Sequence, residues 1–361
     1  MIYKVIGLMS GSSLDGLDIA YVQLDEVRGK WEYQILAAEC VPYSEEWRNR
    51  LTNATSATVP EFLELDTDFG KYLGNSVNAF IAKHSLDHKV HFIASHGHTV
   101  YHSPSTATTG QIGNGAAIAA ITGLPVINDL RATDVALGGQ GAPIVPIGDR
   151  LLFGNYKYLL NIGGIANLTI QENSESAVAF DVCPANQILN ELARRSGKEM
   201  DENGAIASGG KLLEDLLTQL AGHPYYASNA PKSLSNEMAK AIGAKLIQNT
   251  SNKDADLLNT ACYHIADQVF AAINQNGGTE KSGQMLVTGG GAFNTFLLEL
   301  LRAKLSQNGV EVVVPEADVV KYKEALVMAL IGTLRWREEV NVLSSVTGAS
   351  RDSVSGALWL G

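Results

Sequence analysis

The sequence contains two copies of a pattern in which a strand leads into a glycine-rich turn and a second strand follows directly. The first copy is VIGLMSGSSLDGLDIAYVQLD, Val5–Asp25, and the second is YKYLLNIGGIANLTIQ, Tyr156–Gln171. Two apolar runs joined by such a turn predict a β-hairpin. Each hairpin is followed by a third strand-like run, and then by helices and further strands. This pattern favours two α/β halves of duplicated architecture, although no residue-level repeat relates them.

The spacing of apolar residues predicts the individual elements. Apolar residues recur at intervals of three and four from Pro60 to His84, which is the period of a helix. The first three strands are joined by short turns, so they should form an antiparallel meander. The expected strands are Ile2–Leu8, Leu17–Leu24, Trp31–Leu36, Phe92–Ser95, Pro125–Asn128 and Ala177–Phe180. The other expected elements are helices at Ala116–Thr122 and about Ala255–Asn274, and a strand, three glycines and a helix in Gln284–Asn294.

The segment ALGGQGAPIVP, Ala136–Pro146, is where we expect the chain to pass from one half to the other. Its three glycines and two prolines favour an irregular crossing over a regular element. The strand pattern begins again after this segment, which supports a boundary there.

Composition excludes several classes of protein. The 361 residues carry a net charge of -11, with 45% hydrophobic and 18% charged residues, which is typical of a globular protein without affinity for nucleic acid. No apolar run approaches the roughly 20 residues of a membrane span, and the N-terminus does not resemble a secretory signal. The three cysteines lie far apart and do not suggest a disulfide framework, so we expect a cytoplasmic protein. A homodimer is compatible with the sequence, which has no clear interface signal.

The first glycine turn does not match the familiar phosphate-binding motifs. Gly11 and Gly16 have the spacing of a P-loop, but Leu17 and Asp18 stand where lysine and a hydroxyl residue are required. A different arrangement fits, in which two hairpin turns direct backbone amides at a polyphosphate. The run TGGGAFN would then lie against a nucleoside, and Asp15 or Asp18 would hold the water shell of Mg²⁺. The alternative is that these segments are ordinary tight turns.

Asp181, in AFDVCPANQILNEL, is the strongest candidate for a catalytic group. It follows a strand, and strand ends in α/β folds face the ligand. A carboxylate at such a place can act as a general base. The alternative interpretation is a helix N-cap, because Pro184 suits the first turn of a helix, and the local sequence alone favours this cap over the base.

Other polar residues support two interpretations each. The histidines of SHGHTVYH could in principle bind zinc, but substrate hydrogen bonding fits better because no cysteine or carboxylate stands at ligand spacing. Arg131 and Asp134 either pair with each other or bind an anionic group. Glu324 opens an apolar helix, where it either complements the helix dipole or contacts a substrate.

Together these segments closely resemble the anhydro-N-acetylmuramic acid kinase family. The motifs that carry the resemblance are GLMSGSSLDGLD, SHGHTVYH, TGLPVINDLRATDVALGGQGAPIVP, NIGGIANLT, FDVCPAN, PKS, VTGGGAFN and KEA. They occur in family order from Gly7 to Ala325, which is nearly the whole chain, and few other families combine the first loop with GGQGAPIVP.

The resemblance implies the fold of actin, hexokinase and Hsp70, an α/β fold of two ribonuclease-H-like domains with a central ATP cleft. The expected domains are residues 1–136 plus 345–361, with the first phosphate loop, and residues 137–344, with the second loop, the catalytic aspartate and the adenosine loop. The implied nucleotide-binding residues are Gly11, Ser12, Ser13, Leu14, Asp15, Gly16, Leu17, Asp18, Gly163, Gly164, Gly289, Gly290 and Gly291.

The resemblance also implies a reaction. Members of the family use ATP and Mg²⁺ to open a 1,6-anhydro sugar with water and to phosphorylate its O6, in the recycling of cell-wall peptidoglycan. Asp181 would be the catalytic base. The implied sugar-binding residues are His98, Arg131, Asp134, Asn186 and Glu324.

The chain departs from the family pattern at a few positions. The family often has threonine and glycine at Val182 and Cys183, glutamine at His98, and aspartate and proline at Asn114 and Gly115. Because these departures fall near the expected sugar site, two alternatives stay open. One is a kinase for another anhydro sugar such as levoglucosan, and the other is a nucleotide-binding homologue that has lost catalysis.

Overall fold

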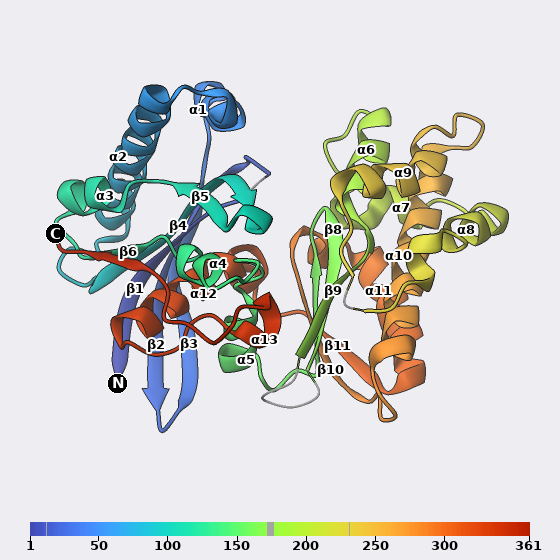
Figure 1. Cartoon of the computed structure of the whole chain (residues 1–361). Helices are drawn as coiled ribbons and strands as arrows, with labels where there is room; N and C mark the ends of the chain where they lie inside the picture. Colours follow the sequence, from blue (N-terminus) through green and yellow to red (C-terminus); the bar gives the residue numbers. More distant parts are fainter. Residues whose placement is uncertain (12, 172–176, 231) are drawn as a thin grey trace. The chain divides into compact units, whose positions relative to one another are not determined.

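The computed structural model describes residues 1–11, 13–171, 177–230 and 232–361. By its internal contacts the chain divides into two compact units. The first unit comprises Met1–Phe153 and Tyr322–Gly361, and the second comprises Gly154–Lys321. Each unit is built on one mixed β-sheet covered by helices (Figure 1).

The sheet of the first unit has the strand order β12-β6-β4-β1-β2-β3, with β5 paired to β4. Strands β1, β2 and β3 form an antiparallel meander, as predicted, and β4 and β6 continue the sheet in parallel with β1. The strands are β1 (Ile2–Ser10), β2 (Gly16–Val27), β3 (Lys30–Pro42), β4 (Phe92–Ser103), β5 (Thr108–Ile112), β6 (Val126–Asn128) and β12 (Ala357–Trp359).

The helices of the first unit begin and end at recognisable signals. Helix α2 (Val59–His84) starts with a capping box between Thr58 and Glu61 and ends at Ser85, whose backbone is left-handed. Its buried face packs into the core of the sheet. The other helices are α1 (Glu45–Thr52), α3 (Gly115–Thr122), α4 (Ala132–Ala136), α5 (Pro146–Leu152), α13 (Ser344–Thr347) and most of α12 (Ala317–Trp336).

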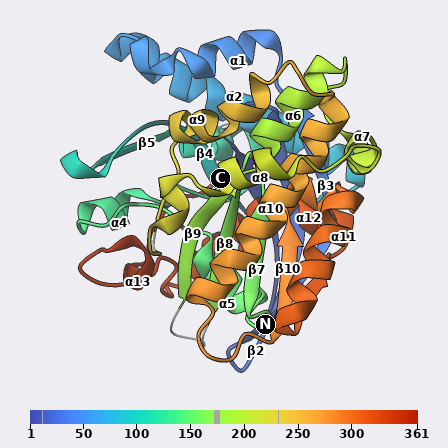
Figure 2. The same ribbon diagram turned by 90° about the vertical axis from the view of Figure 1, so that its right-hand side faces the viewer.

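The sheet of the second unit has the order β11-β10-β7-β8-β9. Helix α10 (Asp254–Asn276) contributes many buried residues to the core of this unit, and Figure 2 shows it in front of the strands. The strands are β7 (Tyr158–Ile162), β8 (Ile165–Gln171), β9 (Ala177–Pro184), β10 (Gly283–Thr288) and β11 (Val310–Val313). The remaining helices are α6 (Asn186–Arg195), α7 (Ala205–Ser208), α8 (Glu214–Ala221), α9 (Asn236–Ile247) and α11 (Thr295–Leu305).

The two units therefore share one topology. In each unit, three strands form an antiparallel meander, and two further strands extend the sheet in parallel beside the first strand of the meander. The strand order is β3-β2-β1-β4-β6 in the first unit and β9-β8-β7-β10-β11 in the second. This is the strand order of the ribonuclease-H-like fold. The predicted fold class, two such domains, is confirmed by the architecture of each unit.

The passage between the units does not lie where the glycine- and proline-rich segment suggested. Residues 136–146 belong to the first unit, and the chain leaves that unit only after Phe153. It returns at Tyr322, inside α12, where the helix is kinked. The division thus differs from the predicted bounds of 1–136 plus 345–361 and 137–344. Part of the reason is that buried polar contacts hold the irregular segment in place, as described below.

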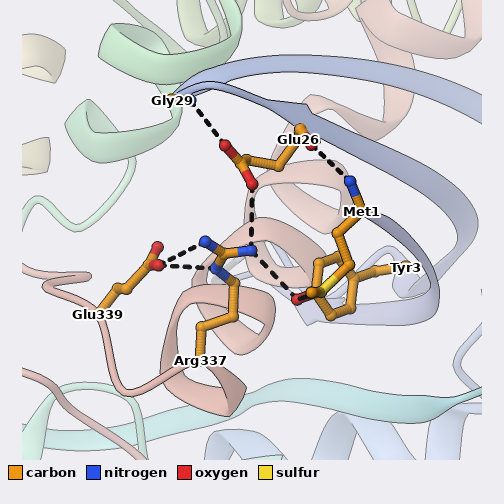
Figure 3. A network of polar contacts seen from close by, with 6 residues as sticks. All are labelled: Met1, Tyr3, Glu26, Gly29, Arg337 and Glu339. Atoms are coloured by element: carbon orange, nitrogen blue, oxygen red, sulfur yellow. Dashed lines mark hydrogen bonds and ion pairs between the residues drawn. The ribbon is translucent and has the colours of Figure 1, made fainter.

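Helix α12 lies directly on the backbone of the first sheet. A Cβ atom added to Gly7 of β1 would lie only 2.0 Å from the carbonyl oxygen of Ala325, so glycine is required for this approach. Beyond the end of the helix, the Arg337 guanidinium lies 3.3 Å from the Glu26 carboxylate and donates to the Tyr3 hydroxyl at 3.2 Å (Figure 3). The part of the helix that belongs to the first unit is therefore held at Ala325 on β1 and, just beyond its end, at Arg337 on β1 and β2.

A buried ion pair joins α12 to α5. The Lys323 ammonium lies 2.7 Å from Asp149, and both residues are buried. Asp149 precedes the point where the chain leaves the first unit, and Lys323 follows the point where it returns. The pair thus ties together the two segments of the first unit.

Among the described residues, no helix combines the length and apolar character needed to cross a membrane.

We predict that Asp149→Ala lowers the free energy of unfolding of the first unit by about 3–5 kcal/mol, because it leaves the Lys323 charge buried without a partner. All four tryptophans lie in the first unit, so urea denaturation followed by tryptophan fluorescence reports on it. The control is Lys71→Ala, which breaks an exposed pair with Asp68 and should cost less than about 1 kcal/mol. Equal losses in the two variants would contradict the role of the buried pair.

Candidate active site

The first glycine turn lies between β1 and β2 of the first unit. Gly16 is required by close packing, because a Cβ there would lie 2.5 Å from the Val41 carbonyl oxygen and 2.7 Å from the Cys40 sulfur. Leu14 has a left-handed backbone (φ 59°), and the side chain of Leu17 points into the core. Only the backbone of Leu17 is therefore placed to face a ligand.

Other residues of this turn remain accessible. Ser13 and Asp15 are exposed, and Gly11 is half-buried. A Cβ added to Gly11 would meet only the Ser13 hydroxyl, at 3.7 Å, which is an ordinary contact. Nothing described in the protein's own packing therefore requires glycine at position 11. Ser12, also predicted to bind nucleotide, lies outside the described residues.

Two carboxylates of the first unit, Asp18 on β2 and Glu324 on α12, interact electrostatically. Burial raises the pKa of Asp18, a hydrogen bond with Cys40 lowers it, and the charge of Asp15 raises it again. Desolvation also raises the pKa of Glu324, and the charge of Asp18 adds to this effect. The Glu324 side chain is nevertheless exposed to solvent, although nearby protein atoms desolvate its carboxylate.

The local structure around Glu324 differs from the prediction. Helix α12 begins at Ala317, and its backbone is non-helical at Tyr322. Glu324 therefore lies in the first turn after the kink rather than at the start of the helix.

Arg131 is hydrogen-bonded to His96, a histidine for which the sequence motifs predicted no individual role. The Arg131 Nε donates to Nε2 of His96 at 2.9 Å, and the other ring nitrogen of His96 lies 2.9 Å from the carbonyl oxygen of Gly97. Burial, together with the Arg131 charge, lowers the pKa of His96 to about 3, so this ring is neutral at physiological pH. Arg131 also interacts with the charge of Glu324.

His98 belongs to a second buried contact beside the first turn. Its Nδ1 lies 2.9 Å from the hydroxyl of Ser10, the last residue of β1, and the Tyr43 hydroxyl donates to the same Ser10 oxygen at 2.7 Å. Burial lowers the pKa of His98. Of the predicted sugar-binding residues, His98, Arg131 and Glu324 thus fall into one polar region of the first unit.

Asp134 has a different place from the one predicted. Its side chain is fully buried, and its two oxygens accept from the backbone N–H of Gly141 at 2.8 Å and from the Thr347 hydroxyl at 2.7 Å. No ion pair between Arg131 and Asp134 occurs among the described residues. Asp134 therefore fixes the glycine-rich segment in the first unit, and its oxygens are not exposed to a ligand.

The second glycine turn, Gly163–Gly164, joins β7 and β8 in the second unit. A Cβ on Gly163 would have only ordinary contacts, the nearest at 3.6 Å, so here too packing does not require glycine. The turn is held by the start of α6, where Asn186 donates through its backbone to the Gly163 carbonyl at 3.0 Å and through its side chain to the Ile162 carbonyl at 3.0 Å.

The third glycine run packs against the second turn. A Cβ on Gly289 would lie 2.5 Å from Oδ1 of Asn161, and one on Gly291 would lie 2.2 Å from the Ile162 side chain. Gly290 between them is exposed. The second turn, Asn186 and Gly289–Gly291 therefore form one continuous region of the second unit.

Asp181 lies inside β9 and is not a helix N-cap. Helix α6 starts at Asn186, and the residue before it, Ala185, makes no side-chain capping bond. The local signal of an aspartate close before a proline was misleading, because β9 continues through Pro184. A bulge in the pairing of β8 with β9 leaves Val182 without a partner on β8. Such bulges often redirect a side chain beside an active site.

The Asp181 carboxylate is half-buried and has one donor on each oxygen. Asn167 Nδ2 donates to Oδ1 at 3.0 Å, and the backbone N–H of Leu234 donates to Oδ2 at 2.8 Å. The sequence motifs indicated neither donor. The register of the hairpin could have indicated Asn167, but Leu234 is more than fifty residues away along the chain and gave no signal.

The departures from the family pattern have identifiable places. Val182 and Cys183 are buried in the core of the second unit. Asn114 caps α3 through a bond from the Ala117 N–H to its side chain at 3.0 Å, a role that aspartate also fills. Gly115 follows at the first position of the helix, where proline is common.

Comparison with known proteins identifies the family to which the chain belongs. A family model described as "Anhydro-N-acetylmuramic acid kinase" matches residues 3–361. An anhydro-N-acetylmuramic acid kinase of Shewanella loihica is 36% identical over 373 residues, covering 99% of this chain and 98% of that protein. The protein of the same name from Pasteurella multocida is 33% identical and covers 98% of this chain and 96% of its own.

The chain belongs to the anhydro-N-acetylmuramic acid kinase family. Among solved structures, the ADPNP-bound activator of 2-hydroxyisocaproyl-CoA dehydratase from Clostridium difficile is similar with a TM-score of 0.44 and 14% identity, covering 91% of this chain and 93% of that one. This structural likeness carries no further argument about the chain.

We predict that His96 makes the first unit sensitive to acid. Because the pKa of His96 is about 3 in the folded protein and about 6.5 when exposed, the unfolded chain binds a proton that the native state excludes. The resulting stability is complete above about pH 6.5 and is lost as the pH falls toward 3, by at most about 1.4 kcal/mol per pH unit. His96→Gln should remove this share of the pH dependence, measured by urea denaturation between pH 7.5 and 5.

The matched control is His88→Asn, which changes an exposed histidine whose left-handed backbone asparagine tolerates. It should leave the pH dependence of unfolding unaltered. Parallel curves for His96→Gln and the unmodified chain would contradict the prediction.

Proposed function

We propose that this chain is an ATP-dependent kinase that adds water across the anhydro bridge of 1,6-anhydro-N-acetylmuramic acid and phosphorylates O6. The products are N-acetylmuramic acid 6-phosphate and ADP. Membership of the kinase family over residues 3–361 supports the reaction. The observation that carries it in the structure is the Asp181 carboxylate, fixed by a donor on each oxygen beside a strand bulge.

The proposed chemistry couples two bond changes. Asp181 accepts a proton from water as the water oxygen attacks the anomeric carbon, and the bond between that carbon and O6 breaks. The released O6 attacks the γ-phosphorus of ATP, and the bond to the ADP oxygen breaks. The proton on Asp181 then passes to solvent. Each step supplies what the other needs, since ring opening provides the nucleophile for phosphoryl transfer.

The two hairpin turns are the proposed phosphate loops. Gly11 and Gly163 have space for a Cβ that the protein's described packing leaves open, so their lack of a side chain fits close approach by a phosphate. Gly289–Gly291 would form the wall against adenosine.

Residues of the first unit fit Mg²⁺ and the sugar. Asp15 and Asp18 supply oxygen donors, and no cluster of three metal-binding side chains occurs in the described part of the chain, which suits an ion held through water and phosphate. Mg²⁺ would supply charge neutralisation on the triphosphate. The Arg131 guanidinium suits the carboxylate of a muramic acid, and His98 and Glu324 are the further sugar-binding candidates.

The reaction belongs to the recycling of peptidoglycan fragments, and we propose that it takes place in the cytoplasm. A homodimer remains a prediction.

We predict that Asp181→Asn lowers sugar-dependent ADP release by at least about 100-fold, because the base is lost while the shape is kept. ATP binding, measured by calorimetry, should persist. The control is Asp215→Asn on the exposed face of α8, which should retain full turnover. Full activity of Asp181→Asn would exclude this residue as the base.

We also predict that Gly11→Ala and Gly163→Ala each raise the Kd for ATP several-fold without altering the midpoint of urea denaturation, because each Cβ has room in the protein but would obstruct a phosphate. Gly222→Ala is the control, since its Cβ would also have only ordinary contacts, at 3.6 Å, on the end of α8. An unchanged ATP affinity in both loop variants would remove the turns from the nucleotide site.

The identity of the sugar is tested separately. Phosphorus NMR of the product formed from ATP and 1,6-anhydro-N-acetylmuramic acid should show a phosphate monoester at O6. Levoglucosan and unmodified N-acetylmuramic acid complete the panel, and preference for either would replace the proposed substrate.

A further inference from the structure

We infer that Asn167 is a positioning residue for Asp181, not a phosphate donor of the second glycine turn. The inference rests on the proposed function, because it concerns the base of that reaction. Asn167 lies on β8 directly opposite Asp181 on β9, and its Nδ2 donates to Oδ1 at 3.0 Å. One N–H of this amide is therefore engaged by the carboxylate, so Asp181 sets the orientation of the side chain that the NIGGIAN motif alone would present as a phosphate donor.

The contact fixes the carboxylate from one side while the backbone fixes it from the other. Leu234 donates its N–H to Oδ2 at 2.8 Å, and the Asp181 N–H donates to the Lys232 carbonyl at 3.0 Å. The plane of the carboxylate is thus set by two donors on different segments. Of these, only Asn167 uses a side chain, so it is the position at which substitution can alter the hold on Asp181.

The first unit has a polar cross-strand pair at the equivalent position, but its carboxylate lies on the other strand of the pair. On β2, Asp18 stands two residues after Gly16 and pairs with Cys40 of β3. On β8, Asn167 stands two residues after Ile165 and pairs with Asp181 of β9. Asp18 is hydrogen-bonded to Cys40, as Asn167 is to Asp181. The shared topology therefore places a polar cross-strand pair at this point in each unit.

A neutral amide at position 167 has a chemical consequence. An aspartate there, as at position 18, would put a second carboxylate within about 3 Å of the base and disfavour its ionised form. Asparagine instead offers a donor to the ionised form.

The other titratable groups around Asp181 do not replace this contact. The Tyr225 hydroxyl donates to the Asp181 backbone carbonyl at 2.7 Å, and burial, with the Asp181 charge, raises the pKa of Tyr225. The Lys232 ammonium donates to the Tyr225 carbonyl at 3.2 Å and lies over the tyrosine ring. Neither forms a described hydrogen bond or ion pair with the Asp181 carboxylate.

The test measures kcat, KM for the sugar, Kd for ATP, and kcat/KM against pH in the full chain. Asn167→Leu should lower kcat by about 10- to 100-fold and move the acid limb of kcat/KM to higher pH, because the ionised base loses a donor and its fixed orientation. Asn167→Asp should move the acid limb further, by about one pH unit or more. ATP affinity should stay within twofold of the unmodified chain in both.

Thr169→Val is the matched control, because Thr169 lies on the same face of β8, two residues further along, and is not opposite Asp181. It should leave kcat and the acid limb unchanged. Should Asn167→Leu fail to fold, Asn167→Asp, which is nearly identical in shape, decides the question.

Asp181→Asn, measured alongside, separates the two proposals. If Asp181→Asn is inactive while both Asn167 variants retain the kcat and the acid limb of the unmodified chain, the positioning role is overturned and the function stands. If Asp181→Asn keeps full activity, Asp181 is not the base, and the positioning role falls with that assignment while the kinase reaction itself stands. A weaker ATP affinity in Asn167→Leu, with an unchanged acid limb of kcat/KM, would overturn the positioning role and indicate that Asn167 is a phosphate donor of the second glycine turn.

Discussion

The close approach of α12 to the first strand positions two charged residues of the first unit. Because Gly7 has no side chain, the backbone of Ala325 rests directly on β1. This contact brings the two residues before Ala325 to the sheet. Lys323 becomes buried against Asp149, and Glu324 comes within electrostatic reach of Asp18 on β2. A larger residue at position 7 would lift the helix and separate both pairs at once.

The glycines of the proposed site fall into two physical groups. At Gly16 and Gly291 a Cβ would collide with neighbouring atoms, so the fold itself requires glycine there. At Gly11 and Gly163 a Cβ would fit, and neither backbone has a positive φ. Folding therefore explains the first group but not the second. The second group is where we propose that a ligand approaches the backbone.

The sequence predicted what depends on local spacing. The meander, the long helix α2 and the strand–turn–strand of both halves were found because their apolar periods are regular. The local sequence favoured a helix cap at Asp181, whereas strand pairing carries β9 through Pro184. The glycine- and proline-rich segment was taken for a junction, although Asp134 and Thr347, far apart in the chain, hold it in the first unit. The family motifs named the candidate residues, but the contacts that orient them, such as Arg131 with His96, are non-local and leave no periodic signal.

The duplicated topology explains why the two halves carry different chemistry at equivalent positions. A cross-strand pair just after a hairpin turn is accessible from the turn and anchored by the sheet, which suits a group that must be both exposed and rigid. In the first unit the carboxylate of this pair is Asp18, on the strand that leaves the turn, where it suits a cation beside phosphate. In the second unit it is Asp181, on the outer strand, with an amide as its partner. The carboxylate of the second unit therefore lies on the strand that does not leave the turn, so one architecture places the proposed metal-side acid and the proposed proton acceptor on different strands.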